Sequence, residues 1–185
     1  MLERLLGRSH TEKIADALYG RAVEQARQPA FYMAMGVSDT VDGRFEMIAL
    51  HVFLILRRLK RDNARTQAVA QALFDTMFTD MDRGLREMGA GDLGVGRRVK
   101  VMAKAFYGRV AAYEQGLKSA NSDLDEAVLR NIFRGEARNR EHAIAISSYL
   151  REQANTLDGQ SVDALLEGKV RFNAPGAGNG ERLPS

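Results

Sequence analysis

The sequence predicts an all-α protein, a single-domain bundle of about six helices followed by a disordered tail. Apolar residues recur at steps of three and four along most of the chain, which is the spacing of helices that bury one face. No region is rich in strand-forming residues, and no repeat of fixed period is present. A length of 185 residues, 45% of them hydrophobic, suits one domain. We place this domain at residues 1–172 and the tail at residues 173–185.

The first predicted helix covers about residues 10–28. Ser9 and Glu12 have the spacing of an N-terminal capping box, and Pro29 is incompatible with a continuing helix. Residues 30–43 follow with several Gly and Asp turn residues and without a clear period. We therefore expect an ordered loop there.

The middle of the chain predicts one helix and then a helical hairpin. The helix carries an apolar stripe that starts at Phe45 and ends at the basic cluster of residues 57–61, where cations favour a helix C-terminus. The hairpin covers about residues 64–117, with Asn63 as its first cap. Both of its arms are amphipathic, and its turn is expected at the glycines of residues 89–94.

The last third of the sequence predicts two more helices and a short turn. The fifth helix opens at Ser122 and ends at Gly135, and the sixth covers about residues 138–156. Ser161 begins a short helical turn, and residues 169–172 are expected to be extended.

Composition excludes several kinds of site. The chain has no cysteine, so disulfides, thiolate metal sites and cysteine nucleophiles are absent. Glu3 and Arg4 interrupt what would be the apolar part of a signal peptide, and no run approaches the roughly 18 apolar residues of a membrane span. The net charge of +3 is compatible with an anionic partner. We therefore expect a cytoplasmic protein.

The stretch MGAGDLGVG contains the pattern G-x-G-x-x-G at Gly89, Gly91 and Gly94. In a dinucleotide-binding loop this pattern follows a buried strand and opens a helix. Here an amphipathic helix precedes it, so the context that nucleotide binding requires is missing. We predict instead a turn between two helices.

The remaining polar motifs do not predict an active site. Asp80 and Asp82 form D-x-D, but on a helix two residues this far apart point in different directions, so a salt-bridged face is favoured over a metal site. The three histidines His10, His51 and His142 lack the spacing of zinc ligands. For His51, beside an apolar stripe, we expect a buried and hydrogen-bonded imidazole. We predict no catalytic residue, metal, cofactor or small-molecule substrate.

The second arm of the hairpin carries a basic surface without acidic residues. It consists of Arg97, Arg98, Lys100 and Lys104. An ordinary solvated face is one interpretation, and contact with anionic lipid or RNA is the other. For Tyr107, which lies off the main apolar stripe, exposure for binding and packing are both open.

Several long stretches resemble a known family. They are QARQPAFYMAMGVSDTVDGRFEMIALHVFL, FTDMDRGLREMGAGDLGVGRRVKVMAKAFYGRVAAYEQGL and, more weakly, GKVRF. Together they cover about residues 12–172 and are similar to the ubiquinol-cytochrome c chaperone family, the assembly factors for cytochrome b of the respiratory bc1 complex. The resemblance implies an all-helical, non-enzymatic chaperone that binds newly made cytochrome b. It further implies peripheral action at the inner face of the inner membrane, and leaves open a second assembly factor and ribosome docking.

A chaperone for such a client needs an adaptable apolar surface edged with charge, for which methionine and aromatic side chains are suited. We therefore expect the client-binding surface where the aromatic loop meets the two arms of the hairpin. The residues expected to form it are Phe31, Tyr32, Met81, Leu85, Met102, Phe106 and Tyr107. A basic all-α module that binds RNA, the ribosome or the membrane surface without a dedicated client is the alternative, and an enzyme is the third. RNA binding should weaken steeply with salt, unlike apolar client capture.

Overall fold

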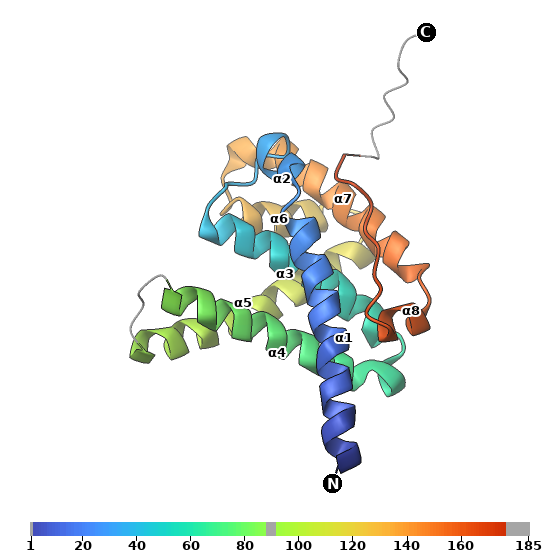
Figure 1. Cartoon of the computed structure of the whole chain (residues 1–185). Helices are drawn as coiled ribbons and strands as arrows, with labels where there is room; N and C mark the ends of the chain where they lie inside the picture. Colours follow the sequence, from blue (N-terminus) through green and yellow to red (C-terminus); the bar gives the residue numbers. More distant parts are fainter. Residues whose placement is uncertain (1, 88–91, 177–185) are drawn as a thin grey trace.

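The computed structural model describes residues 2–87 and 92–176, with side chains from residue 10 onward and, after the gap, from residue 94 (Figure 1). The elements are α1 (Leu2–Ala26), α2 (Pro29–Met33), α3 (Val41–Lys60), α4 (Asn63–Glu87), α5 (Asp92–Lys118), α6 (Asp123–Ile132), the 3-10 helix η1 (Ala137–Asn139), α7 (Arg140–Asp158) and α8 (Val162–Leu166). No strand occurs in the described ranges. The predicted all-α class is confirmed.

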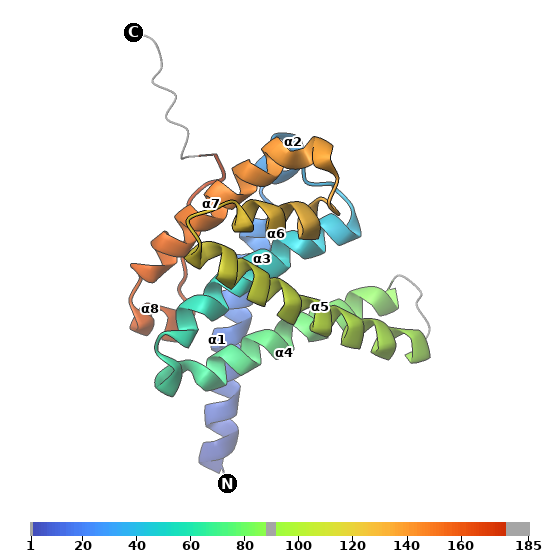
Figure 2. The same ribbon diagram turned by 180° about the vertical axis from the view of Figure 1, so that it is seen from behind.

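Helix α3 forms the centre of the bundle. Its run ALHVFLIL, residues 49–56, is apolar on every side, and a helix of that kind is stable only when it is surrounded. Twelve of its 20 residues are buried, and α1, α4, α6 and α7 all pack against it. Figure 2 shows α6 and α7 on the side opposite α1.

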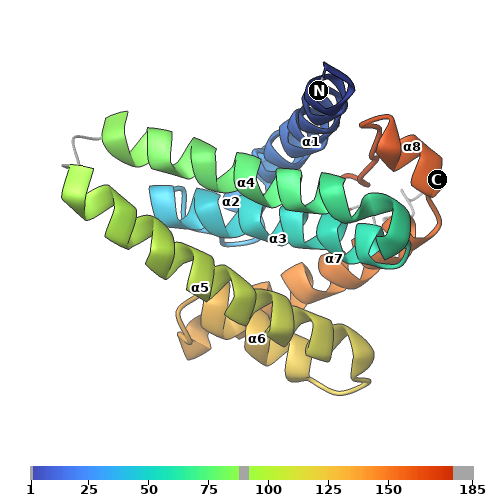
Figure 3. The ribbon, with the colours of Figure 1, turned by 90° about the horizontal axis from the view of Figure 1, so that it is seen from below.

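Helices α4 and α5 form the predicted hairpin, whose outer end projects from the body as an arm (Figures 1 and 3). A helix therefore precedes the glycine pattern, as expected. The prediction for the turn needs a correction, because α5 begins at Asp92 and Gly94 lies inside it. Residues 88–91, which include Gly89 and Gly91, lie outside the described part of the chain.

Two predictions for the N-terminal region were wrong in detail. Helix α1 begins at Leu2 rather than near residue 10, because the preceding Leu, Glu and Arg residues are themselves good helix formers and nothing there stops a helix. The expected loop contains the short helix α2, which begins at Pro29, where the fixed φ of proline suits a first helical turn.

A buried histidine joins the central helix to its neighbours. His51 of α3 is fully buried, with Nδ1 2.7 Å from the Met47 carbonyl oxygen and Nε2 2.8 Å from the Tyr149 hydroxyl. A carbonyl only accepts, so Nδ1 carries the proton, Nε2 accepts, and Tyr149 donates. The Tyr149 oxygen in turn accepts from the Gln25 amide of α1 at 2.9 Å. The expectation of a buried, hydrogen-bonded imidazole is confirmed.

Aromatic rings enclose the same histidine. Phe31 of α2 lies 5.6 Å from the His51 ring and 5.1 Å from the Tyr149 ring, while Phe172 lies 5.1 Å from His51. We refer to Gln25, Phe31, His51, Tyr149 and Phe172 as the His51 hub. It unites α1, α2, α3, α7 and the segment after α8.

The segment after α8 is extended, as predicted for residues 169–172, and is held by side chains of the α7 region. Gln160 exchanges two hydrogen bonds with the backbone of Arg171, and Gln153 accepts from the Asn173 amide at 2.8 Å. Asn173 also accepts from Gln25 through its carbonyl. The ordered segment therefore continues past the boundary that we placed at residue 172, while residues 177–185 lie outside the described range.

The His51 hub predicts a pH-dependent stability. Burial lowers the pKa of His51 to about 4, whereas an unfolded histidine titrates near 6.5. As the pH falls from 6.5 toward 4, the unfolded chain takes up a proton that the folded chain does not accept. The contribution of the neutral His51 to the free energy of unfolding is complete above about pH 6.5. Roughly 3 kcal/mol of this free energy is lost by about pH 4.

Urea denaturation of the parent and of His51→Gln between pH 7 and pH 4 measures this loss. The difference in unfolding free energy between the two proteins should shrink as the pH falls, because the variant lacks the titrating group. A difference that stays constant over this range would contradict the argument.

The contact between α5 and α6 predicts opposite effects for two glycines of α5. A Cβ at Gly116 would lie 2.6 Å from the Leu124 Cα, so Gly116→Ala should force the two helices apart and lower the unfolding free energy by about 1–3 kcal/mol. A Cβ at Gly108 meets nothing within 4 Å, so Gly108→Ala should raise it by about 0.5–1 kcal/mol. Thermal unfolding of both variants checks this, and a shift of the same sign in both would refute it.

Candidate functional site

A groove of about 1160 Å³ runs between the start of α3 and the α4–α5 arm. One wall is the loop and first turn of α3, residues 36–46, and the other is the face of α5 between residues 97 and 109. Leu85 of α4 and residues 130–139, at the end of α6, complete it. Its apolar lining consists of Val41, Phe45, Leu85, Val101, Met102, Ala105, Ile132 and Phe133.

Two of these apolar side chains face solvent from opposite walls. Val41 is 59% exposed and Val101 is 63% exposed, although large apolar side chains elsewhere in the described chain are mostly buried. Exposed apolar side chains that line a common groove are typical of an interaction site.

The wall at residues 36–43 depends on close backbone contacts. A Cβ at Gly43 would lie 2.0 Å from the Ser38 carbonyl oxygen, so only glycine allows the loop to fold back onto the first turn of α3. Thr40 caps that helix by accepting from the Gly43 amide at 3.2 Å. Gly36 has φ +72°, and a Cβ there would lie 2.5 Å from the His142 ring, so the other end of the wall also requires glycine.

A largely buried ion pair joins the two walls of the groove. Arg109 of α5 binds both carboxylate oxygens of Glu46 of α3, one of them at 2.6 Å through Nε. The Arg109 guanidinium also lies 5.6 Å from the centre of the Phe45 ring. Burial raises the pKa of the Glu46 carboxyl, and the hydrogen bonds from Arg109 oppose that rise.

The predicted client-binding residues of the arm divide between the groove and its surroundings. Leu85 and Met102 line the groove. Phe106 is only 1% exposed and packs against Phe74 and Phe78. Because it lies in the core, its prediction as a contact residue needs correction.

Tyr107 is 61% exposed and stacks on Phe74 of α4, with the ring centres 5.4 Å apart. It does not line the groove. The sequence left open whether Tyr107 is exposed or packed, and the structure shows that it is exposed. A binding role for Tyr107 stays a prediction. Met81 is partly buried and packs against the core.

The aromatic loop does not place its rings where we expected. Phe31 is fully buried in the His51 hub, and the hydroxyl of the half-buried Tyr32 donates to the Ala26 carbonyl at 2.7 Å. The residues of this region that line the groove come later, from Gly36 to Glu46. Aromatic content indicated an ordered segment but not which of its residues reach the surface.

The predicted basic surface also divides in two. Arg97 and Arg98 line the groove, whereas Lys100 and Lys104 do not. At 100° per residue, Val101 and Ala105 lie between Arg97 and Arg98 around α5. Lys100 and Tyr107 lie on the adjacent side of the helix, and Lys104 lies about 20° from Arg97. All four cations are exposed.

Sequence reasoning missed the contribution of α6. Arg130, Ile132 and Phe133, at the end of α6, also line the groove. The signal for their position is the end of the helix, where Gly135 has φ +76° and its amide donates to the Leu129 carbonyl at 2.9 Å. The sequence indicated where α6 ends. It did not indicate that this end lies beside α5, because that is a contact between distant parts of the chain.

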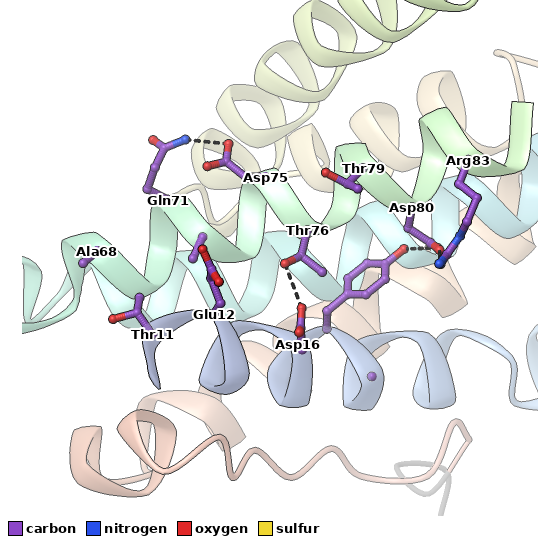
Figure 4. A pocket seen from close by; sticks show the side chains of 13 residues that line it. Thr11, Glu12, Asp16, Ala68, Gln71, Asp75, Thr76, Thr79, Asp80 and Arg83 are labelled. Carbon is purple, nitrogen blue, oxygen red and sulfur yellow. Dashed lines mark hydrogen bonds and ion pairs between the residues drawn. The ribbon is translucent and has the colours of Figure 1, made fainter. Parts of the chain in front are cut away.

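A second groove, of about 940 Å³, lies between α1 and α4 (Figure 4). Its polar side chains bind one another: Thr76 donates to Asp16 at 3.1 Å, Gln71 to Asp75 at 2.9 Å, and Tyr19 to Asp80 at 2.8 Å. The Thr76–Asp16 and Tyr19–Asp80 bonds join the two helices, and the Gln71–Asp75 bond lies within α4. All three carboxylates therefore already have a partner inside the protein.

Asp80 of the D-x-D motif lines this second groove, and Asp82 does not. Asp80 also binds Arg83, and Asp82 pairs with Arg86 at 2.6 Å, so the predicted salt-bridged face is confirmed. Among the side chains that the structure describes, no group of three or more His, Asp or Glu could hold a metal ion. Within the described ranges, no helix is long and apolar enough to cross a bilayer.

An open apolar groove bordered by arginines, in an all-helical body, has the features of a site that binds a polypeptide. Residues 33–172 match the model of the family described as ubiquinol-cytochrome C chaperone, and the chain belongs to that family. The crystal structure of the Cbp3 homolog from Brucella abortus superimposes with a TM-score of 0.81 at 38% identity, over 94% of this chain and 97% of that one.

Animal relatives carry the name ubiquinol-cytochrome c reductase complex assembly factor 1. The mouse and human proteins are each 25% identical over 156 residues, which is 84% of this chain. The chain spans about half the length of these relatives, 53% of the mouse and 52% of the human protein.

The buried ion pair of the groove predicts a large effect of substitution. Glu46→Ala leaves the Arg109 guanidinium without its carboxylate in a largely buried position, which typically costs about 3–5 kcal/mol. Arg134→Ala breaks the pair with Asp42 in the same groove, but both side chains are 74% exposed, so the loss should stay below about 1 kcal/mol. Denaturant unfolding compares the two, and equal losses would show that the Glu46–Arg109 pair does not hold the walls together.

Proposed function

We propose that this chain is an assembly chaperone that binds newly synthesised cytochrome b and promotes assembly of ubiquinol-cytochrome c reductase, the cytochrome bc1 complex. The observation that carries the proposal is the groove between α3 and α5, with exposed apolar side chains on both walls. Membership in a chaperone family supports the class of activity, and the names of the animal relatives support the complex it serves. The chain acts by binding, without catalysis or a cofactor.

The groove suits a segment of a membrane protein before it has found its partners. Such a segment exposes an apolar helix face, and an apolar groove shields that face from water and from other copies. Met102 and Leu85 give the lining side chains that adapt to different shapes. A volume of about 1160 Å³ exceeds the usual range of roughly 300–1,000 Å³ for small-molecule pockets, which supports a polypeptide occupant.

The proposed place of action is the inner face of the inner membrane, where the chain works peripherally from the cytoplasm. A second assembly factor and the ribosome are further proposed partners, because the client is bound soon after its synthesis. Neither partner has an assigned surface.

A second candidate function rests on the basic surface of α5 outside the groove. Lys100, Lys104 and the exposed Tyr107 share a helix stretch without acidic residues, which suits an anionic surface such as lipid headgroups or RNA. In this reading the chain is a basic all-α module. Binding would then fall steeply with salt, through counterion release.

Co-purification of cytochrome b with the tagged chain, from membranes of cells that are synthesising it, tests the first proposal. Val101→Asp places a charge in the groove and should reduce capture at least fivefold, while Ile144→Asp, at a 46% exposed position outside the groove, should not. Both variants should keep the thermal midpoint within a few degrees, because both positions are exposed. Equal capture by the two variants would exclude the groove as the client site.

Tyr107 provides a further comparison on the same assay. Tyr107→Ala should leave stability nearly unchanged and reduce capture if the client extends around α5, whereas Phe106→Ala should lower stability by about 3–5 kcal/mol and reduce capture with it. Full capture by Tyr107→Ala would confine the client to the groove.

A further inference from the structure

The groove holds more arginine than carboxylate. Six arginines line it, at positions 97, 98, 109, 130, 134 and 138, against three acidic residues, at positions 42, 46 and 136. Each acid is already engaged by an arginine of the groove: Asp42 by Arg134, Glu46 by Arg109 and Glu136 by Arg138. In the part of the chain that the structure describes, Arg97, Arg98 and Arg130 have no carboxylate partner.

These three arginines lie on two sides of the apolar lining. Arg97 and Arg98 belong to α5, next to Val101, and Arg130 is at the end of α6 across the groove. All three are exposed, so their guanidinium groups are available to a ligand. The groove therefore offers an apolar surface with unpaired cations at its borders.

We propose that the occupant of the groove is an amphipathic helical segment of the client whose apolar face is flanked by Asp or Glu, and that Arg97, Arg98 and Arg130 pair with those carboxylates. This inference rests on the proposed function and specifies the chemistry of the same site. The planar guanidinium matches a carboxylate with two parallel hydrogen bonds. Desolvation by the apolar lining makes such pairs stronger than they are in water.

The distribution of cations favours this occupant over an anionic membrane. A flat anionic surface would engage the exposed cations of the arm alike, whereas Arg97 and Arg98 line the groove and Lys100 and Lys104 do not. The cations that border the groove are all arginines, and they frame apolar side chains rather than a flat face. A peptide segment satisfies both features at once.

The test uses three synthetic peptides of about 18 residues, long enough to form a helix, and the whole chain. All three carry the same Leu face at helical spacing, and the flanking positions are Glu in the first, Gln in the second and Lys in the third. Fluorescence anisotropy should show that the Glu peptide binds at least tenfold more tightly than the Gln peptide at low salt, and the Lys peptide most weakly. Equal affinity of the Glu and Gln peptides would overturn the inference.

A matched pair of double variants assigns the effect to the groove. Arg97→Gln/Arg98→Gln and Lys100→Gln/Lys104→Gln remove the same charge from exposed positions of the same helix, but only the first pair lines the groove. The first double variant should lose at least fivefold of the preference for the Glu peptide, and the second should keep it. Equal loss in both would show a general basic surface and overturn the assignment.

Cytochrome b capture separates the two proposals. If Val101→Asp captures the client as well as the parent does, the proposed function fails at this groove. If Val101→Asp loses capture while Arg97→Gln/Arg98→Gln keeps its preference for the Glu peptide, only the carboxylate assignment is overturned.

Discussion

The arrangement of the bundle depends on the hydrogen-bond chain from Gln25 through Tyr149 and His51 to the Met47 carbonyl. Each bond fixes the donor of the next, since the carbonyl sets the tautomer of the imidazole and the imidazole sets the direction of the Tyr149 hydroxyl. A buried polar group without a partner costs about 1–3 kcal/mol, so none of these residues tolerates a shift of its helix. Together with the apolar packing of α1, α3 and α7, this chain of bonds favours one register of the three helices.

That register decides where the groove opens. From its middle to its end, α3 is enclosed by α1, α4, α6 and α7, and its last turn is tied down by Arg58, which donates to the Gln160 carbonyl at 2.7 Å. Its first turn lies beside the α4–α5 arm, and Val41 stays exposed there. The Glu46–Arg109 pair spans that opening. The groove is therefore the place where the central helix leaves the core, and its walls are held by an ion pair instead of a continuous apolar contact.

The sequence predicted the helices well because their signals are local. The period of Val95, Phe106 and Tyr113 is a property of one helix, and these residues are all buried in the structure. The hydrogen-bonded His51 was also predictable, since an imidazole beside an apolar stripe needs partners. Its partner Tyr149 was not, because it lies 98 positions away.

The site was predicted less completely for the same reason. Periodicity placed Leu85 and Met102 beside the core stripe, and both line the groove. It could not distinguish them from Phe106, which points inward, because the boundary of a groove is set by what packs opposite. Phe31 shows the same limit. Its aromatic side chain correctly indicated an ordered segment, but the ring is buried in the His51 hub and not exposed to a client. Arg130 and Phe133 come from a helix that the local signal gave no reason to connect with α5.

Stability and recognition use different arginines in this groove. Arg109 is mostly buried, and its pair with Glu46 holds α5 against α3. The exposed pairs of Arg134 and Arg138 neutralise the remaining acids of the lining and contribute little to stability. Among the described residues, Arg97, Arg98 and Arg130 have no carboxylate partner, so an incoming carboxylate does not have to break an internal ion pair there. A site built in this way can bind and release a charged segment without loosening the walls that shape it, which is the requirement on a chaperone that must later give up its client.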